Sequence, residues 1–260
     1  MCTLVILHRP KAAWPLIMAA NRDELDSRPW RAPARHWPDR PEIIAGQDIS
    51  AGGSWLGIND HGVVAAVLNR PGTLGPEDGK RSRGELVLEA LDHAEARAAA
   101  DALSELNPAS YRPFNLVVAD CFDAFWLRHA GNQPSFRVRT PKGIWRELDP
   151  LHMPAHAPLD LRKGGSQAMA KEGAIFCQPI PQGLSMITAH DLNDPTSPLI
   201  SHYLPRFQKA EIPNPENGDW TGWIELLADR SSPDGDPRHA MTVVGAGSFT
   251  TVCSQLLAFP

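Results

Sequence analysis

The sequence predicts one α+β domain over residues 1–260, built from antiparallel sheets with helices packed on them. Three observations predict this class. Short apolar segments occur in pairs joined by turn residues, which is typical of β-hairpins. A longer segment repeats apolar residues at three- and four-residue steps, as an amphipathic helix does. Proline makes up 25 of the 260 residues, and this excludes a mainly helical bundle.

The first half of the chain begins with a predicted hairpin of residues 3–7 and 14–20, joined by a segment that contains Pro10. Residues 21–53 are rich in Arg, Pro, Asp and Gly and have no clear period, so we expect a long loop there. Residues 54–58 and 63–68 flank an Asn-Asp-His-Gly turn, which is the strongest hairpin signal in the chain.

The remaining elements follow the same rules. The apolar spacing over residues 83–105 predicts a single helix. Residues 130–182 are weakly patterned and give no assignment. Elsewhere we expect a strand pair at 114–119 and 122–128, short helices at 198–208 and 219–229, and two last strands at 241–244 and 249–253.

Composition excludes several classes of function. The net charge of −5 and the pI near 6.0 argue against a nucleic-acid-binding protein, which normally has a basic face. No stretch of eighteen apolar residues occurs, so we expect no integral membrane segment. The four cysteines are far apart and have no C-x-x-C spacing, which favours reduced thiols in a cytoplasmic protein over a zinc site or disulfides. His152 and His156 are separated by Pro154, which disfavours a helical metal pair.

Cys2 is the candidate nucleophile. It directly follows the initiator Met1, and it is small enough for an aminopeptidase to remove that methionine. A processed Cys2 would carry a thiol and an α-amine on one residue, and an amine with a pKa of about 8 can accept the thiol proton near neutral pH. The alternative is that Cys2 is an ordinary small hydrophobic residue on a strand.

Two polar segments follow predicted strands and are expected near Cys2. If the first hairpin forms, Asn21-Arg22-Asp23-Glu24 comes back beside residue 2, where an acid or a guanidinium could hold the amine or stabilise the thiolate. The alternative is a solvated loop of mixed charge. Asn69 ends the second hairpin, where its amide can either stabilise an oxyanion or begin a turn.

These segments, in this order, resemble one known family. Met1-Cys2-Thr3, Asn21-Arg22-Asp23-Glu24, Trp55-Leu56-Gly57-Ile58-Asn59 and Leu68-Asn69-Arg70 are similar to the NRDE family, also called the transport and Golgi organisation protein 2 family. The resemblance continues through Arg81-Ser82-Arg83-Gly84-Glu85-Leu86 and Phe114-Asn115-Leu116-Val117, and it covers most of the first half.

That family is in turn similar to N-terminal-nucleophile hydrolases of the cysteine type, such as conjugated bile acid hydrolase and penicillin V acylase. The resemblance implies a four-layer αββα fold and an amide-cleaving N-terminal cysteine. Their R-N-x-D segment matches at Asn21 and Asp23, whereas Ala20 occupies the arginine position and Arg22 lies two residues further on the same strand face. A family asparagine in a mid-chain T-N or S-N dipeptide has no clear counterpart in residues 165–195.

The resemblance therefore implies a site and two candidate functions. As catalytic residues we expect Cys2, Arg22, Asp23 and Asn69, and as substrate-binding residues Asn21, Glu24 and Trp55, with no cofactor and no metal. The first candidate function is hydrolysis of an amide or thioester bond of a small acyl substrate through an acyl-Cys2 intermediate. The alternative is a non-catalytic carrier with the same fold, whose cargo would be heme, acyl-CoA or another lipid. The sequence indicates neither substrate identity nor oligomeric state.

Overall fold

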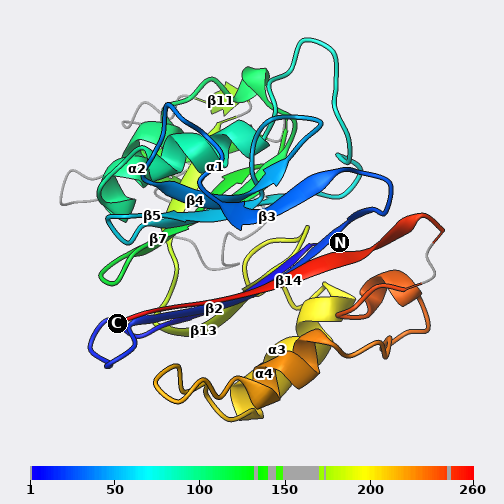
Figure 1. Ribbon diagram of the computed structural model, residues 1–260. Helices are drawn as coiled ribbons and strands as arrows, with labels where there is room; N and C mark the ends of the chain where they lie inside the picture. Colours follow the sequence, from blue (N-terminus) through cyan, green and yellow to red (C-terminus); the bar gives the residue numbers. More distant parts are fainter. Residues whose placement is uncertain (1, 132–133, 140–144, 149–169, 173, 245–246) are drawn as a thin grey trace, which may run out of the picture.

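In the computed structural model, two antiparallel sheets stack face to face and helices cover the outer side of each sheet (Figure 1). The structure describes residues 2–131, 134–139, 145–148, 170–172, 174–244 and 247–260. The order of layers is helices, sheet, sheet, helices, which is the predicted four-layer αββα arrangement.

The first sheet is built around the N-terminal strand. Its strands run in the order β13-β1-β2-β14, so that β1 is central. Thr3 pairs with Asn21, which confirms the first predicted hairpin and brings residue 2 beside the end of β2. The bounds are β1 Thr3–His8, β2 Leu16–Leu25, β13 Gly183–Ile187 and β14 Phe249–Phe259.

The second sheet runs in the order β12-β8-β7-β6-β5-β4-β3. It contains the predicted second hairpin and the predicted pair after the helices, both confirmed. Its strands are β3 Trp30–Ala34, β4 Ile43–Asp48, β5 Leu56–Asn59, β6 Val64–Asn69, β7 Phe114–Ala119, β8 Ala124–His129 and β12 Ile175–Pro179. A small separate sheet joins β9 Pro134–Arg139, β10 Trp145–Leu148 and β11 Ala170–Glu172.

The helices lie in two pairs. Helices α1 Gly84–Leu91 and α2 Ala96–Ser104 pack on the second sheet, whereas α3 Pro198–Lys209 and α4 Thr221–Leu227 pack on the first (Figure 1). Short 3₁₀ turns occupy Pro108–Ser110 and Pro237–His239. No helix within the described residues combines the length and the apolar character needed to cross a membrane.

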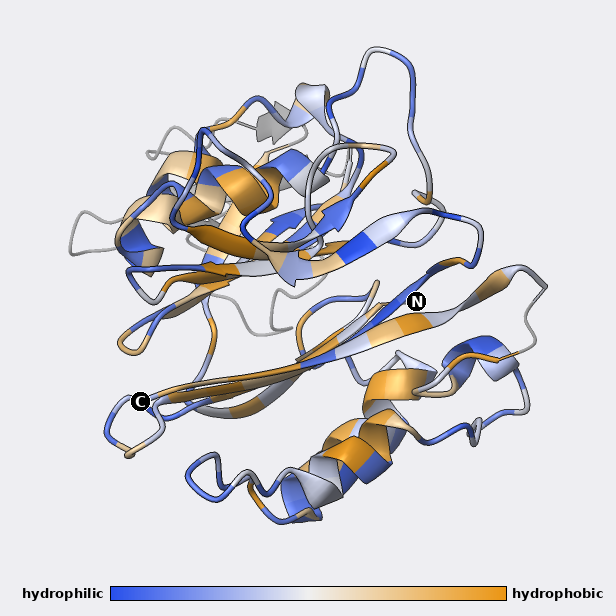
Figure 2. Ribbon diagram, in the orientation of Figure 1, coloured by the Kyte–Doolittle hydropathy of each residue, from blue (hydrophilic) through white to orange (hydrophobic). Residues whose placement is uncertain are grey.

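Apolar side chains form three layers, one under each helix pair and one between the sheets. The hydrophobic residues accordingly concentrate on strands and helices, and the hydrophilic ones on loops (Figure 2). Leu4 and Ile6 face the layer between the sheets, while Ile17 faces α3 and α4; all three are buried as alternation on a covered strand predicts. The same alternation predicts that Val67 is buried, but this side chain is only partly covered.

The prediction of a long loop over residues 21–53 is wrong. Strand β2 extends to Leu25, and β3 and β4 form the edge of the second sheet. Most residues of β3 are exposed, and Pro33 lies within it, so it carries no alternating apolar pattern. Pairing with β4, rather than local sequence preference, specifies this strand.

The single helix predicted over residues 83–105 is in fact two helices, separated by residues 92–95. Side chains distant in the sequence form hydrogen bonds with the free backbone groups at the facing ends of the two helices. The Asn59 amide donates to the carbonyl oxygens of Leu91 and His93, and the Asp120 carboxylate accepts from the amide of Ala96. These capping partners are distant in sequence, so apolar spacing alone did not reveal the break.

The two predicted C-terminal strands are replaced by the single strand β14. Residues 241–244 are not a strand, although the Thr251 amide donates to the Val243 carbonyl. Strand β14 instead pairs along the full length of β2, from Phe249 opposite Leu25 to Phe259 opposite Leu16. Pairing with the long strand β2 extends β14 to Phe259, and no turn signal after Phe249 interrupts it.

Candidate active site

Cys2 lies immediately before the central strand β1, on its inner face. Leu4 and Ile6 belong to the apolar layer between the sheets, and Cys2 packs against the same layer. Because side chains on a strand alternate between its two faces, residues 2, 4 and 6 all point toward the second sheet. The thiol is half-buried there.

Strand β2 divides the N-R-D-E segment between its two faces. Met18 and Ala20 pack in the layer between the sheets, and Arg22 and Glu24 continue that face. Asn21 and Asp23 continue the opposite face, which is covered by α3 and α4. The five predicted residues Cys2, Asn21, Arg22, Asp23 and Asn69 therefore do not all face one cavity.

A cavity of about 320 Å³ opens at this end of the two sheets, and we call it the Cys2 cavity. Five of the seven predicted site residues line it: Cys2, Arg22, Glu24, Trp55 and Asn69. The sequence prediction missed its other charged lining residues, which are Arg28, Asp48, Glu77, Lys80, Arg81, Arg83 and Arg112.

Arg22 is the most enclosed cation of the site, with 5% of its side chain exposed. Its Nη2 lies 3.6 Å from carboxylate oxygens of both Glu24 and Asp48. Its guanidinium also stacks on the Trp55 ring, 4.4 Å from the centroid. The Nη1 group is buried and makes no hydrogen bond with any described residue. A buried donor without a partner is costly, so this N–H is suited to a substrate oxygen.

Asp23 lies beside Cys2 although its carboxylate is on the other face of β2. The Cys2 Sγ donates a 3.5 Å hydrogen bond to the Asp23 carbonyl oxygen. The Asp23 carboxylate accepts from the Thr251 hydroxyl of β14, and burial raises its pKa. This residue is well placed to interact with groups attached to the Cys2 backbone.

The Cys2 thiol is not activated in the chain that retains Met1. Burial, followed by the negative charge of Asp23, raises its pKa to about 11. Arg22 acts in the opposite direction, as expected, but its effect is smaller. In this form of the chain burial outweighs the guanidinium, and the predicted reactivity of Cys2 after removal of Met1 stays a prediction.

Asn21 joins three elements through its side-chain amide. Its Nδ2 donates to the carbonyl oxygens of Leu227 and Met241 at 2.9 and 2.8 Å. Its Oδ1 accepts from the Ser254 hydroxyl at 2.6 Å. These bonds join β2 to the end of α4 and to β14, and they occupy both ends of the amide. The side chain is buried and both of its N–H donors are used, so among the described residues only one further acceptor position of Oδ1 is open.

Asn69 ends β6 and lines the cavity near the start of α1. Alternation places it on the same strand face as Val67, so it reaches the cavity past the end of the sheet. None of the described residues hydrogen bonds with its side-chain amide. The amide is therefore available to a ligand.

Trp55 is held rigidly in the wall between the two sheets. Its Nε1 donates to the Gln255 side chain of β14 at 2.6 Å, and its ring packs edge-on against Trp30. A Cβ at Gly46 would lie 2.3 Å from the indole, so the ring occupies space that only glycine leaves open there. The indole thus presents a fixed platform to Arg22.

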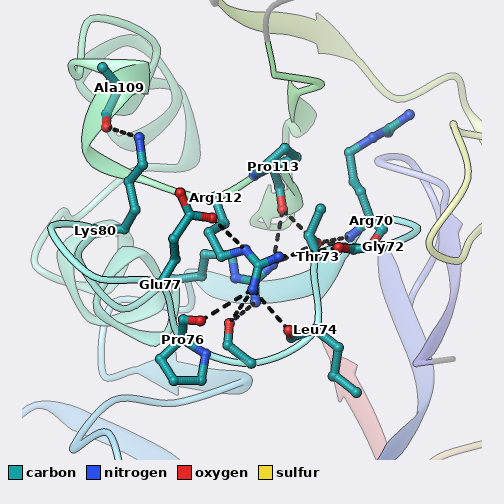
Figure 3. A network of polar contacts seen from close by, with 12 residues as sticks. Arg70, Gly72, Thr73, Leu74, Pro76, Glu77, Lys80, Ala109, Arg112 and Pro113 are labelled. Carbon is teal, nitrogen blue, oxygen red and sulfur yellow. Dashed lines mark hydrogen bonds and ion pairs between the residues drawn. The ribbon is translucent and has the colours of Figure 1, made fainter.

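The segment between β6 and α1 forms the remaining wall, and Arg112 holds it in shape. Its guanidinium donates to four backbone carbonyls of the segment and lies 3.3 Å from the Glu77 carboxylate. Figure 3 shows this side chain at the centre of the loop that it organises. The carbonyls belong to Gly72, Leu74, Gly75 and Pro76.

Arg81 and Arg83 of this segment belong to the motifs that resemble the family, but the sequence alone predicts no role for them in the site. The segment ends at Gly84, the first residue of α1, whose carbonyl oxygen accepts from the Ser54 amide. A Cβ at Gly53 would lie 2.5 Å from the Gly84 carbonyl carbon, so these two glycines permit a close backbone approach. The unusual density of arginine in residues 81–83 is the one signal that could have marked this wall.

Some predictions concern residues outside the described part of the chain, among them His152 and His156. Part of residues 165–195, where the family asparagine is expected, also lies outside the described residues. Among the described residues, no group of three or more His, Cys, Asp or Glu side chains could hold a metal ion.

Residues 1–153 match the model of the family described as Transport and Golgi organisation 2. The chain belongs to this family. It is 39% identical over 134 residues to the Transport and Golgi organization protein 2 homolog of Bos taurus, and 40% identical over 134 residues to that of Homo sapiens. Each alignment covers 46% of this chain and 45% of the relative, so the chain matches about half the length of these family members.

A solved structure extends the comparison to the whole fold. The Caenorhabditis elegans N-acylethanolamine-hydrolyzing acid amidase ortholog aligns with a TM-score of 0.52 and 14% sequence identity. The alignment covers 90% of this chain and 88% of the amidase. This Transport and Golgi organisation 2 family member therefore has the predicted fold of an N-terminal-nucleophile hydrolase.

Proposed function

We propose that this protein is a cysteine hydrolase that cleaves an amide or thioester bond of a small acyl substrate through an acyl-Cys2 intermediate. The observation that carries the proposal is the position of Cys2 at the start of central strand β1, in one cavity with Arg22 and Asn69. An N-terminal-nucleophile-type fold supports the same chemistry.

The first step requires removal of Met1. The α-amine of Cys2 then accepts the thiol proton, and the sulfur forms a bond to the acyl carbon. As the carbon–nitrogen or carbon–sulfur bond breaks, the ammonium returns the proton to the leaving amine or thiol. Water then attacks the acyl-Cys2 thioester with the amine as base, which releases the acid and restores the thiol.

The neighbouring residues have complementary roles in this proposal. Asp23 would orient the ammonium of processed Cys2, because the thiol already donates to its backbone oxygen. Arg22 would donate its buried, unpaired Nη1–H to the substrate, and Asn69 would stabilise the oxyanion. Glu24 and Trp55 would support substrate binding through the orientation of Arg22.

The test is acylation of the processed protein, followed by intact mass. We expect Met1 to be absent, an octanoyl thioester to add one octanoyl group to Cys2, and the adduct to decay with release of octanoic acid. Cys2→Ser should form little adduct, because an alcohol is far harder to deprotonate with an amine of pKa about 8. No adduct across amide, lactone and thioester donors, with Met1 confirmed absent, would contradict the proposal.

A carrier of heme, acyl-CoA or another lipid is the second candidate. It is favoured by the raised pKa of the Cys2 thiol, which makes the thiol a poor nucleophile while Met1 is present. A carrier predicts cargo binding that is unchanged in Cys2→Ser and in Asn69→Ala, with no turnover of any acyl donor. A cytoplasmic location stays a prediction for both candidates.

A further inference from the structure

The Cys2 cavity is positively charged, although the chain as a whole is acidic. Six cationic and three acidic side chains line the cavity, whereas the net charge of the protein is −5. Such local reversal of charge attracts anions into a recessed site.

Most of these cations already have a carboxylate partner. Arg22 and Arg28 share Glu24 and Asp48. Arg81 is paired with Glu85 and Glu89, two carboxylates that do not line the cavity. As described above, Arg112 lies beside Glu77.

Lys80 extends away from this centre to donate to the Ala109 carbonyl oxygen at 2.7 Å (Figure 3). Lys80 is half-buried, and a neutral carbonyl oxygen already accepts from its ammonium group.

Arg83 differs from the other four arginines of the cavity, because its hydrogen-bond acceptors are all neutral. Its Nη1 donates to the Thr73 hydroxyl at 2.8 Å and to the Pro113 carbonyl at 3.0 Å, and its Nη2 donates to the Gly75 carbonyl at 3.4 Å. No ion pair joins it to a carboxylate of the described residues. The side chain is nevertheless recessed in the wall.

The electrostatic environment of Arg83 is accordingly unfavourable for its charge. Burial and the nearby Arg112 lower its pKa to about 10, so it is still cationic at neutral pH. An ionised Cys2 thiolate and the Glu24 carboxylate, both in the same cavity, would act on the pKa of Arg83 in the opposite direction. A bound anion would relieve this environment.

We propose that Arg83 binds an oxyanion, either a carboxylate or a phosphate, carried by the acyl substrate in the Cys2 cavity. The guanidinium fork suits both groups. Anchoring the loop does not by itself account for a charged residue at this position, because Arg112 already binds four carbonyls of the same loop. The inference deepens the proposed function by specifying an acyl substrate with an anionic group, but the binding test does not depend on catalysis.

The test uses matched ligands on the full chain with Cys2→Ser, which prevents turnover. N-octanoylglycine carries a carboxylate, octyl phosphate carries a phosphate, and N-octanoylglycinamide is the neutral counterpart. By isothermal titration calorimetry at pH 7, we expect at least one anionic ligand to bind about tenfold or more tightly than the neutral amide. Whichever of the two anionic ligands binds more tightly shows whether the site prefers a carboxylate or a phosphate.

Arg83→Gln should weaken binding of that anionic ligand by about 10- to 100-fold, the range for loss of a charged hydrogen-bond partner. It should leave the neutral amide nearly unchanged. Arg83→Lys should retain part of the affinity, because it keeps the charge without the fork.

Two controls separate anion binding from loss of loop structure or of general charge. Thr73→Val removes a hydrogen-bond partner of Arg83 without changing any charge. Arg81→Gln removes the same charge from the same cavity, but from a residue that already has two carboxylate partners. We expect each control to change anion affinity by less than about threefold, and thermal melting would verify folding of all variants.

The proposal is overturned if neither anionic ligand binds, if both bind no better than the amide, or if either control weakens binding as much as Arg83→Gln. If a neutral octanoyl thioester still acylates Cys2 in these cases, the proposed hydrolase function stands although the anion site is rejected. Conversely, Arg83-dependent anion binding without any acylation of Cys2 would reject the hydrolase and retain the anion site.

Discussion

The Arg22 guanidinium lies 4.4 Å from the centre of the Trp55 ring and joins the two sheets across the Cys2 cavity. Arg22 belongs to β2 of the first sheet, and Trp55 directly precedes β5 of the second. Contact with a ring face stabilises a cation while leaving its in-plane N–H groups directed elsewhere. The relationship therefore holds a buried guanidinium beside Cys2 without using all of its donors.

Gly46→Ala should disrupt this relationship without changing any charged residue. The new Cβ would lie 2.3 Å from the Trp55 ring, so the indole must move and withdraw its support from Arg22. We expect acylation of Cys2 to fall by about tenfold or more and stability to decrease by about 1–3 kcal/mol.

Gly222→Ala is the matched control. Gly222 lies in helix α4, and the nearest atom to its added Cβ is the Glu211 carbonyl oxygen at 3.8 Å. It should leave acylation unchanged and stabilise the helix slightly. Equal acylation rates in both variants would show that the position of the indole does not matter.

Alkylation of Cys2 should depend steeply on pH while Met1 is present. With a thiol pKa of about 11, only about one molecule in 10⁴ carries the thiolate at pH 7, and the fraction rises about tenfold per pH unit up to that pKa. Removal of Met1 should raise the rate at pH 7, because an ammonium on the same residue lowers the thiol pKa. Mass spectrometry after iodoacetamide treatment measures both forms. A rate that is the same with and without Met1 would contradict this account.

Asn69→Ala should lower kcat of the processed enzyme by about 100- to 1000-fold, the usual effect of losing one oxyanion donor. KM should change little, because the lost hydrogen bond is made mainly in the transition state. Steady-state kinetics with an octanoyl thioester test this prediction. A change confined to KM would instead assign Asn69 to ground-state binding.

Asn21→Ala should destabilise the fold far more than it affects chemistry. It leaves the buried carbonyl oxygens of Leu227 and Met241 without their amide donor and removes the acceptor of Ser254. We expect a loss of about 3 kcal/mol in the free energy of unfolding, measured by urea denaturation. Below the unfolding transition, acylation should stay within about threefold of the parent. A large loss of acylation in fully folded protein would instead support the predicted contact of Asn21 with the substrate.

The candidate site could be predicted in part because its polar residues follow the ends of hairpin strands. Local signals predicted those hairpins, and pairing of Thr3 with Asn21 then brought Cys2 beside the N-R-D-E segment. The same reasoning did not separate Arg22 from Asn21, since both were expected to face the cavity. Which face of β2 meets the second sheet depends on the packing of the layers, which no local pattern encodes.

By itself, the sequence determined the α+β class, the hairpins around Cys2 and the polar residues that follow their strands. Apolar periodicity and turn residues act over a few positions and therefore specify such elements directly. Tertiary structure alone decided the edge strands β3 and β4, the pairing of β14 with β2, and the entry of Arg83 into the Cys2 cavity. These features arise from contacts between residues distant in the chain. The pKa of Cys2 was decided in the same way, because burial depends on every layer that covers the thiol.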